Sequence, residues 1–203
     1  GRNLSSNLAL DENNEVWAID NNFRGSLNLI KKKRNLKQNF CDICDYNKVE
    51  RLIRDANTVF HLAAINGTKN FYEIPEKVLE VGILGTHNIA KACIKNDVAQ
   101  LVFASSSEVY QKPEHIPTTE EETCRVPEIT NPRLSYGGSK ITGELIVINY
   151  LRKSNTSFTI LRPHNVYGPA MGFDHVVPEI TKKIYQSSNG RRKTGESVEI
   201  KIE

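Results

Sequence analysis

The sequence predicts an α/β fold built on a doubly wound parallel sheet with helices on both faces. Short apolar runs alternate along the chain with longer segments whose apolar residues recur at helical spacing. We expect strands at residues 15–19, 39–40 (the end of a weaker strand), 58–64, 101–104, 157–161 and 197–202. We expect helices at residues 47–55, 75–95, 136–153 and 177–186, and a long loop at residues 111–132. In this architecture ligands bind beyond the carboxyl ends of the strands.

Local signals support the individual elements. Asp45 precedes the 47–55 helix and can cap it, because its carboxylate accepts from free N–H groups of the first turn. Pro75 suits the first turn of the 75–95 helix, where its missing N–H costs nothing. The 111–132 loop is rich in Pro, Thr and Glu, and so long a loop in a compact domain is more often functional than idle.

The composition is that of a soluble globular chain. Its 203 residues can bury the core of one domain with a small appendage. The apolar content of 38% and charged content of 25% are ordinary, and the net charge of +3 is too small to indicate a nucleic-acid partner. The basic run at residues 31–34 is expected to be a solvated loop. With no membrane-length apolar run and no signal-peptide pattern, we expect a cytoplasmic location and no membrane partner.

The cysteines do not predict a metal site. Cys41 and Cys44 have the spacing of a redox pair or of half a zinc site. The sequence has no second such pair, because Cys93 and Cys124 are isolated. We therefore expect ordinary thiols in a reducing compartment.

Tyr136 and Lys140 form the most informative pair in the chain. Four residues apart on a helix, they lie on one face about a turn apart. The arrangement suits removal of a proton from an alcohol whose carbon loses hydride. A free tyrosine has a pKa of about 10, so a base at neutral pH needs a drop of roughly 3 units, or about 4 kcal/mol. A neighbouring lysine and a cationic nicotinamide ring could supply it.

Two glycines follow the tyrosine. Gly137 and Gly138 would let a flat group, such as a nicotinamide-bearing cofactor or a sugar, pack on the helix. The alternative is a loosely defined helix start.

Other polar or small residues fall at strand ends. Asp20 can accept hydrogen bonds from adenosine ribose hydroxyls, which favours NAD over NADP, or it can cap a turn. The short side chains of residues 62–64 would let a cofactor approach the backbone, unless they only pack a strand end. Ser106 and Ser107 can donate to a substrate oxygen or cap their strand, and Glu108 is either an acid–base group or a solvated loop residue.

Seven ordered motifs carry a resemblance to a known family. They are VWAID-Asn21, CD-Ile43, FHL-Ala63-Ala64, GTHN around Thr86, SSSEVY around Ser106, Tyr136-x-x-x-Lys140 and RPHNVYGP around Asn165. On these residues the chain resembles the extended short-chain dehydrogenase/reductase family, the NAD-dependent nucleotide-sugar epimerases and dehydratases. The resemblance implies a Rossmann-like fold, NAD as cofactor and a nucleotide-sugar substrate, and in the family a homodimer is usual.

The resemblance also implies roles for single residues. The adenosine half of NAD would be held by Asp20, Asn21, Asp42 and Ile43, and its middle would be lined by Leu62, Ala63 and Ala64. Tyr136 would be the base and Lys140 would hold the nicotinamide ribose while depressing the phenol pKa. Ser106 takes the place of the catalytic Ser or Thr, with Ser107 beside it. His164 would face the cofactor, and Asn165 is similar to a substrate-phosphate ligand.

The reaction within this family stays open. The segment from Ser106 to Tyr110 is similar to the Thr-Ser-Glu-Val-Tyr of UDP-glucuronate decarboxylases. Ser107 replaces the acid of dTDP-glucose 4,6-dehydratases, and some epimerase-like sequences retain a glutamate at the position of Glu108. All share a first step, oxidation of a sugar hydroxyl to a ketone by bound NAD.

Two departures from the family pattern concern the ends of the sequence. Residues 1–8 lack the family's first strand and Gly-rich turn, Ser5 stands where a glycine is expected, and residues 8–15 are too few for the usual helix. We therefore expect a gap in the sheet. We expect an NAD-binding domain at residues 1–170 and an incomplete substrate domain at 171–203. The alternative is a non-catalytic Rossmann-like module that does not bind NAD tightly.

A third departure lies inside the chain. Gly82 replaces an asparagine often found before the GTHN motif.

Overall fold

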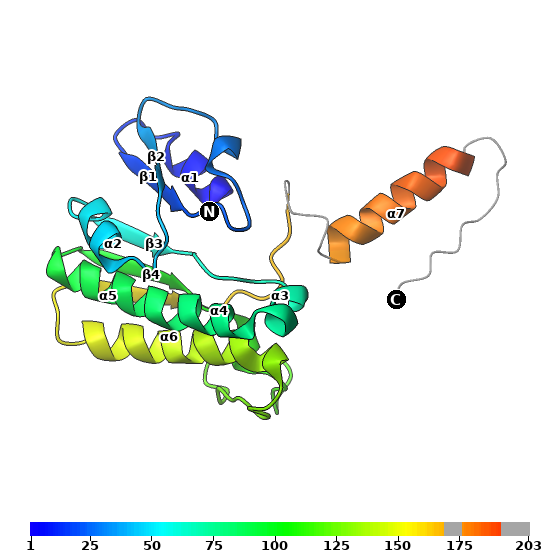
Figure 1. Cartoon of the computed structure of the whole chain (residues 1–203). Helices are drawn as coiled ribbons and strands as arrows, with labels where there is room; N and C mark the ends of the chain where they lie inside the picture. Colours follow the sequence, from blue (N-terminus) through cyan, green and yellow to red (C-terminus); the bar gives the residue numbers. More distant parts are fainter. Residues whose placement is uncertain (169–175, 192–203) are drawn as a thin grey trace. The chain divides into compact units, whose positions relative to one another are not determined.

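The computed structural model describes residues 1–168 and 176–191. They fall into two compact units, Gly1–His164 and Asn165–Glu203 (Figure 1). The second unit contains the helix α7, Val176–Arg191. It includes the whole of the helix expected at residues 177–186. The strand expected at 197–202 lies outside the described residues. The boundary between an NAD-binding and a substrate domain stays a prediction.

The first unit is organised on parallel strands, as the sequence predicts. The strands β3 (Thr58–His61), β4 (Gln100–Ala104) and β5 (Ser157–Leu161) form one sheet in that order. The strands β1 (Val16–Asp20) and β2 (Leu36–Phe40) form another. All pairs are parallel, so the carboxyl ends of β3, β4 and β5 lie at one edge.

The expected gap is present between these two sheets. Among residues 1–168 and 176–191, β1 pairs only with β2, and β3 pairs only with β4. Each sheet has its own core. The small core consists of Ala9, Val16, Ala18, Leu27, Ile30 and Leu36, and the large core packs the helices onto β3–β4–β5.

The helices of the large core lie side by side on one face of the three-stranded sheet (Figure 1). They are α2 (Tyr46–Leu52), α4 (Pro75–Glu80), α5 (Thr86–Lys95) and α6 (Ser135–Leu151). These helices pack on parallel strands in the α/β architecture that the sequence predicts. Phe60 and Leu161, which alternate with core-facing residues of β3 and β5, are exposed.

The helix expected at 75–95 contains a wider turn at its middle. Between α4 and α5 the π-helical turn η2 spans Val81–Gly85. A Cβ atom on Gly82 would lie 2.6 Å from Cβ of Ser139, so the missing side chain lets α6 approach closely. The glycine that replaces the family's asparagine therefore has a packing reason here.

Several short elements have no counterpart among the expected ones. The helix α1, Arg2–Leu8, packs against β1, although no helix is expected this early in the chain. The helix α3, Thr68–Glu73, follows residues 62–64, which extend past the end of β3. Single 3-10 turns occur at η1 (Leu27–Leu29), η3 (Ser107–Val109) and η4 (Pro132–Leu134).

No helix in the part of the chain that the structure describes is long and apolar enough to cross a membrane.

Candidate active site

The candidate site lies where β4 and β5 end beside the first turns of α6. The pairing continues beyond both strands, because Ser105 N donates to Leu161 O at 2.8 Å and Ser107 N donates to Pro163 O at 3.0 Å. These two bonds bring the segment that carries Ser106 next to the one that carries His164. The predicted edge of the sheet thus brings both motifs together.

Tyr136 points toward this strand end. Its side chain is 8% exposed, and its ring stacks on Phe71 with a centroid distance of 5.1 Å. The side chain of Ser106 interacts with the phenol in a way that acts to lower its pKa. The phenol is therefore neither in solvent nor surrounded only by apolar groups.

Lys140 lies beneath Tyr136 in a buried position. It is 3% exposed, and its Nζ donates to Ala104 O at 2.7 Å. The same Nζ is 5.5 Å from the centroid of the Tyr136 ring. Burial lowers the pKa of Lys140 to about 8, against the opposing pull of the Glu144 carboxylate.

The pKa of Tyr136 in the chain by itself lies above its ordinary value. Burial raises it, and the nearby Glu108 acts in the same sense, while Ser106 and the charge of Arg24 act to lower it. The expected lowering by Lys140 together with a cationic nicotinamide ring stays a prediction.

Glu108 forms an ion pair, which is neither of the two roles expected for it, an acid–base group or a solvated loop residue. Its carboxylate accepts two hydrogen bonds from Arg133, at 3.2 Å from Nη1 and 2.8 Å from Nη2. The guanidinium also lies 5.0 Å from the centroid of Phe71. Glu108 is therefore half of an ion pair beside Tyr136. The sequence contained one indication that a cation lies near Tyr136, because Arg133 comes about one helical turn before it.

Sequence reasoning also missed a buried polar network behind Ser106. The Glu144 carboxylate accepts from Ser105 Oγ at 2.5 Å and from Arg162 Nε at 2.9 Å. Arg162 Nη1 donates to Tyr110 Oη at 2.8 Å. A signal was available, because Glu144 lies one turn after Lys140 on the same helix and is followed by an apolar run.

A buried histidine lies under the same sheet edge. His61 Nε2 is 2.9 Å from Thr86 Oγ1, and the threonine hydroxyl donates to Gly82 O at 2.7 Å. Since that hydroxyl donates its proton to Gly82, the assignment that fits is a neutral His61 with its proton on Nε2. Burial lowers the pKa of His61 to about 3.

The ends of β1 and β2 present carboxylates. Asn21 Nδ2 donates to Asp42 Oδ2 at 3.1 Å, which joins the two strand ends, and Asp20 is exposed. Burial acts to raise the pKa of Asp42, but hydrogen bonds from Cys44 and Asn21 hold it below its usual value. Carboxylate acceptors on adjacent strand ends suit a ligand rich in hydroxyl donors, such as a ribose.

The other residues expected to contact the cofactor differ in how accessible they are to a ligand. Leu62 and Ala63 are exposed after β3, as a close approach of a ligand requires. The Ile43 side chain is instead buried in the core, so it offers a ligand mainly its backbone. Asn165 belongs to the second unit, and its role as a substrate ligand stays a prediction.

Gly137 serves the packing of the chain itself. A Cβ atom there would lie 2.9 Å from the carbonyl oxygen of Glu108. The flat-ligand reading is therefore wrong for Gly137, because the turn that carries Glu108 already fills this space. For Gly138, where a Cβ would have ordinary contact with Val126 at 3.6 Å, the reading stays open.

The four cysteines are free thiols. Burial raises the pKa of Cys41, of Cys44 to about 11 and of Cys93 to about 12, so these thiols are protonated at neutral pH. Within residues 1–168 and 176–191, no cluster of three or more His, Cys, Asp or Glu side chains could hold a metal.

Comparison with known proteins identifies relatives over most of the chain. A profile described as the NAD dependent epimerase/dehydratase family matches residues 1–200. UDP-glucuronic acid decarboxylase 1 of Xenopus tropicalis is 31% identical over 176 residues, which is 84% of this chain and 39% of that protein. A putative UDP-glucose 4-epimerase of Methanocaldococcus jannaschii is 34% identical over 161 residues, 78% of this chain and 50% of the relative.

A solved structure of a related enzyme has a fold similar to that of this chain. The Bordetella bronchiseptica enzyme WbmG in complex with NAD superposes with a TM-score of 0.75 at 25% identity. The match covers 91% of this chain and 56% of WbmG. The chain thus spans about half the length of the proteins it matches.

Proposed function

This chain belongs to the NAD dependent epimerase/dehydratase family, and from that premise we propose that it carries the catalytic half of a nucleotide-sugar enzyme. The reaction would begin with oxidation of a sugar hydroxyl to a ketone. Epimerisation or dehydration would follow from the acidity that a ketone gives to neighbouring carbons. The observation that supports this proposal most is the buried Tyr136 ring with the ammonium of Lys140 5.5 Å from its centroid, at the strand end that carries Ser106.

Each group in this arrangement has a definite task. Ser106 donates to the oxygen of the reacting sugar hydroxyl, while the Tyr136 phenolate removes its proton. Lys140 supplies a fixed positive charge under the phenol and a donor for a ribose hydroxyl. Both Tyr136 and Lys140 are buried, which limits the access of water to the phenol and the ammonium.

The residues at the strand ends fit NAD as the cofactor. Asp20 and Asp42 offer acceptors for the adenosine half, and the exposed backbone after β3 offers close approach to its middle. His164 lies on the segment that pairs with the serine segment. NAD, when bound, would accept the hydride that leaves the sugar carbon. The free thiols of all four cysteines suit a reducing compartment such as the cytoplasm.

Decarboxylation of a nucleotide hexuronate is a second candidate reaction. Loss of water across two sugar carbons uses a base that removes a proton beside the ketone, and the Glu108 carboxylate is paired with both terminal nitrogens of Arg133. A β-keto acid loses carbon dioxide without such a base. A 31% identical relative is named as a UDP-glucuronic acid decarboxylase.

The test is incubation of the chain and NAD with UDP-glucose, UDP-glucuronate and dTDP-glucose, followed by product analysis. Inversion, loss of water and loss of carbon dioxide give products of different mass or retention. We expect one of them. If NAD binds and no sugar is converted, the proposal is wrong and the non-catalytic alternative stands.

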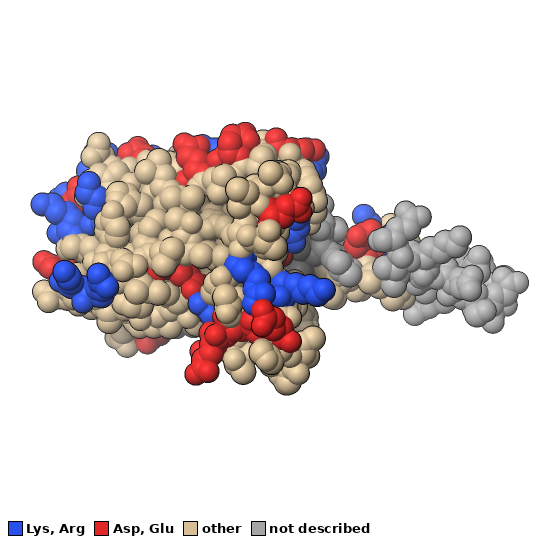
Figure 2. Space-filling model, turned by 90° about the horizontal axis from the view of Figure 1, so that it is seen from below, with Lys and Arg blue, Asp and Glu red and all other residues tan. Residues whose placement is uncertain are grey.

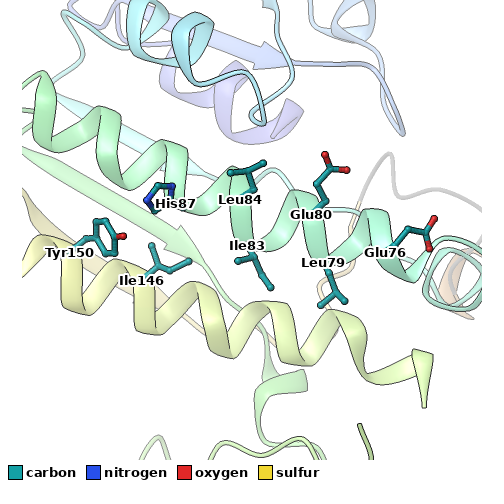
Figure 3. Close-up of a pocket in the computed structure, with 8 residues that line it drawn as sticks. All are labelled: Glu76, Leu79, Glu80, Ile83, Leu84, His87, Ile146 and Tyr150. Carbon is teal, nitrogen blue, oxygen red and sulfur yellow. The ribbon is translucent and has the colours of Figure 1, made fainter. Parts of the chain in front are cut away.

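A second copy of the chain is the partner we propose for the outer face of α4, η2 and α5. Figure 3 shows a groove between these elements and α6, lined by Leu79, Ile83, Leu84, Ile146, His87, Tyr150, Glu76 and Glu80. Nearby Leu145 on α6 is 56% exposed. Figure 2 shows a broad area without charged side chains, and the two charged residues within α6, Lys140 and Glu144, are buried.

The charges around the groove favour a two-fold arrangement. Acidic side chains lie at the α4 end, whereas basic residues follow the end of α6 at 152–153. An antiparallel second copy would place acidic against basic ends. Sedimentation should give a dimer that Leu84→Lys dissociates. A monomeric wild-type chain would contradict the proposal.

A further inference from the structure

We propose that the buried Glu144 and the half-buried Arg162 form a positioning pair that fixes the Ser105–Ser106 strand end against α6 and keeps the Lys140 ammonium charged beneath Tyr136. Its catalytic meaning rests on the proposed function. The effect on Lys140 is a property of the chain itself, which makes the two separable by experiment.

The Glu144 carboxylate is fully engaged. It is 5% exposed, and it accepts from Arg162 Nε at 2.9 Å, from Arg162 Nη2 at 2.6 Å and from Ser105 Oγ at 2.5 Å. Two parallel bonds from a guanidinium fix direction as well as distance. The serine bond then joins α6 directly to the end of β4.

Arg162 connects this carboxylate to the segments that follow Ser106. Its Nη1 donates to Tyr110 Oη at 2.8 Å and to Glu120 O at 3.1 Å. Tyr110 directly follows η3, and Glu120 belongs to the 111–132 loop. One side chain from the end of β5 therefore holds both the serine turn and the loop.

These contacts hold the turn that carries Ser106, whose hydroxyl accepts from Glu108 N at 3.2 Å. Ser105 on one side is held by Glu144, and Tyr110 beyond the turn on the other side is held by Arg162. Catalytic groups need placement to within about 0.5 Å, which requires neighbours that are themselves locked by hydrogen bonds. The pair supplies that lock without facing the substrate.

The second effect concerns Lys140, one helical turn before Glu144. Three ionisable groups face this ammonium: Tyr136 and Glu144 on α6, and His61 on β3. His61 is neutral because burial lowers its pKa to about 3, and Tyr136 is neutral because burial raises its pKa. Glu144 is the anion of the three, and it opposes the effect of burial on Lys140.

Stability alone does not explain a buried ion pair. Well-packed apolar residues of similar volume often stabilise a protein as much as a buried pair does, because desolvation of two charges is costly. A role in positioning and charge therefore accounts better for Glu144 and Arg162 than a role in stability.

The test is a nuclear magnetic resonance titration of the whole chain with 13C-labelled lysine, in which the Lys140→Met variant identifies the Lys140 signal. In Glu144→Gln we expect the Lys140 titration midpoint to fall by about 1 pH unit, because an opposite charge is lost nearby. The matched control is Glu122→Gln, which breaks the pair with Arg125 in the loop and should leave the midpoint unchanged. An unchanged midpoint in folded Glu144→Gln overturns the proposal.

A second variant keeps the test decisive if the first does not fold. The double variant Glu144→Gln with Arg162→Gln removes both charges of the pair, so the guanidinium is not left without its carboxylate. A downward shift is expected there too, smaller than in Glu144→Gln because loss of the Arg162 cation offsets part of it. An unchanged midpoint again overturns the proposal.

Turnover supplies an independent readout. If a nucleotide sugar is converted, Glu144→Gln should move the alkaline limb of kcat to lower pH by the same amount, which a merely structural role would not do. Absence of turnover with every sugar sinks the proposed function and leaves the titration result intact.

Discussion

The sheet β3–β4–β5 and the N-terminal segment α1–β1–β2 hold their polar groups in different ways. Around the large core, buried polar side chains bond to one another, as in the link from Ser105 through Glu144 to Arg162. Around the small core the buried residues are all aliphatic, and the carboxylate of Asp20 is exposed. The difference teaches that the reacting groups are fixed by buried hydrogen bonds, while the expected adenosine end offers acceptors at the surface.

The largest effect is expected from Tyr136→Phe in the first region. Loss of the base should reduce turnover by about 10²- to 10⁴-fold, while NAD affinity stays nearly unchanged. Tyr150→Phe on the same helix is the matched control, because Tyr150 lines the outer groove. Product formation and NAD titration measure the two quantities. A Phe variant that retains turnover would show that the base is another group.

The next effect is on stability and contrasts the two cores. Leu101 is completely buried at 0% exposure in the large core, so Leu101→Ala should reduce the free energy of unfolding by about 2–5 kcal/mol. Urea denaturation followed by circular dichroism measures it. A loss below about 1 kcal/mol would mean that the core collapses around the cavity.

The same substitution in the small core should act locally. Leu36→Ala should increase hydrogen exchange in β1 and β2 and leave α5 and α6 protected, because the two sheets share no strand pairing among the described residues. Hydrogen exchange resolved by mass spectrometry separates the segments. Equal loss of protection in α6 would contradict two independent cores.

A smaller effect concerns acid sensitivity of the large core. His61 has a pKa of about 3 when folded and an ordinary value near 6.5 when unfolded, so the unfolded state binds the extra proton between these values. Stability contributed by neutral His61 is therefore present above pH 6.5 and lost as pH falls toward 3. The slope is about 1.4 kcal/mol per pH unit. Denaturation at several pH values should show a smaller slope for His61→Gln, and an identical slope would contradict the assignment.

The sequence predicted much of the fold because strands and amphipathic helices are local patterns. The runs at 58–64, 101–104 and 157–161 gave β3, β4 and β5 in parallel order. Which face of this sheet the helices α2, α4, α5 and α6 cover was not predictable, because it depends on which segments pack together. The helix at Thr68–Glu73 was missed because its six residues are too few for a periodic pattern.

The candidate site was predictable only where a motif is local. Tyr136 and Lys140 share one helix, and Ser106 follows a strand, so their meeting could be inferred. Arg133 pairs with Glu108, and Arg162 pairs with Glu144. The members of each pair lie far apart in the sequence, so residue spacing does not predict that they meet. The effect of burial, which raises the Tyr136 pKa in the chain by itself, was not predictable either, since burial is a tertiary property.

The most direct test of the account is a titration of the Tyr136 phenol by its absorbance near 295 nm, as the difference between the wild-type chain and Tyr136→Phe. We predict a pKa above the ordinary value of about 10 in the chain alone and a drop of roughly 3 units when NAD is saturating, because the cationic ring then stabilises the phenolate. A phenol that still titrates above about 10 with NAD bound would contradict Tyr136 as the base.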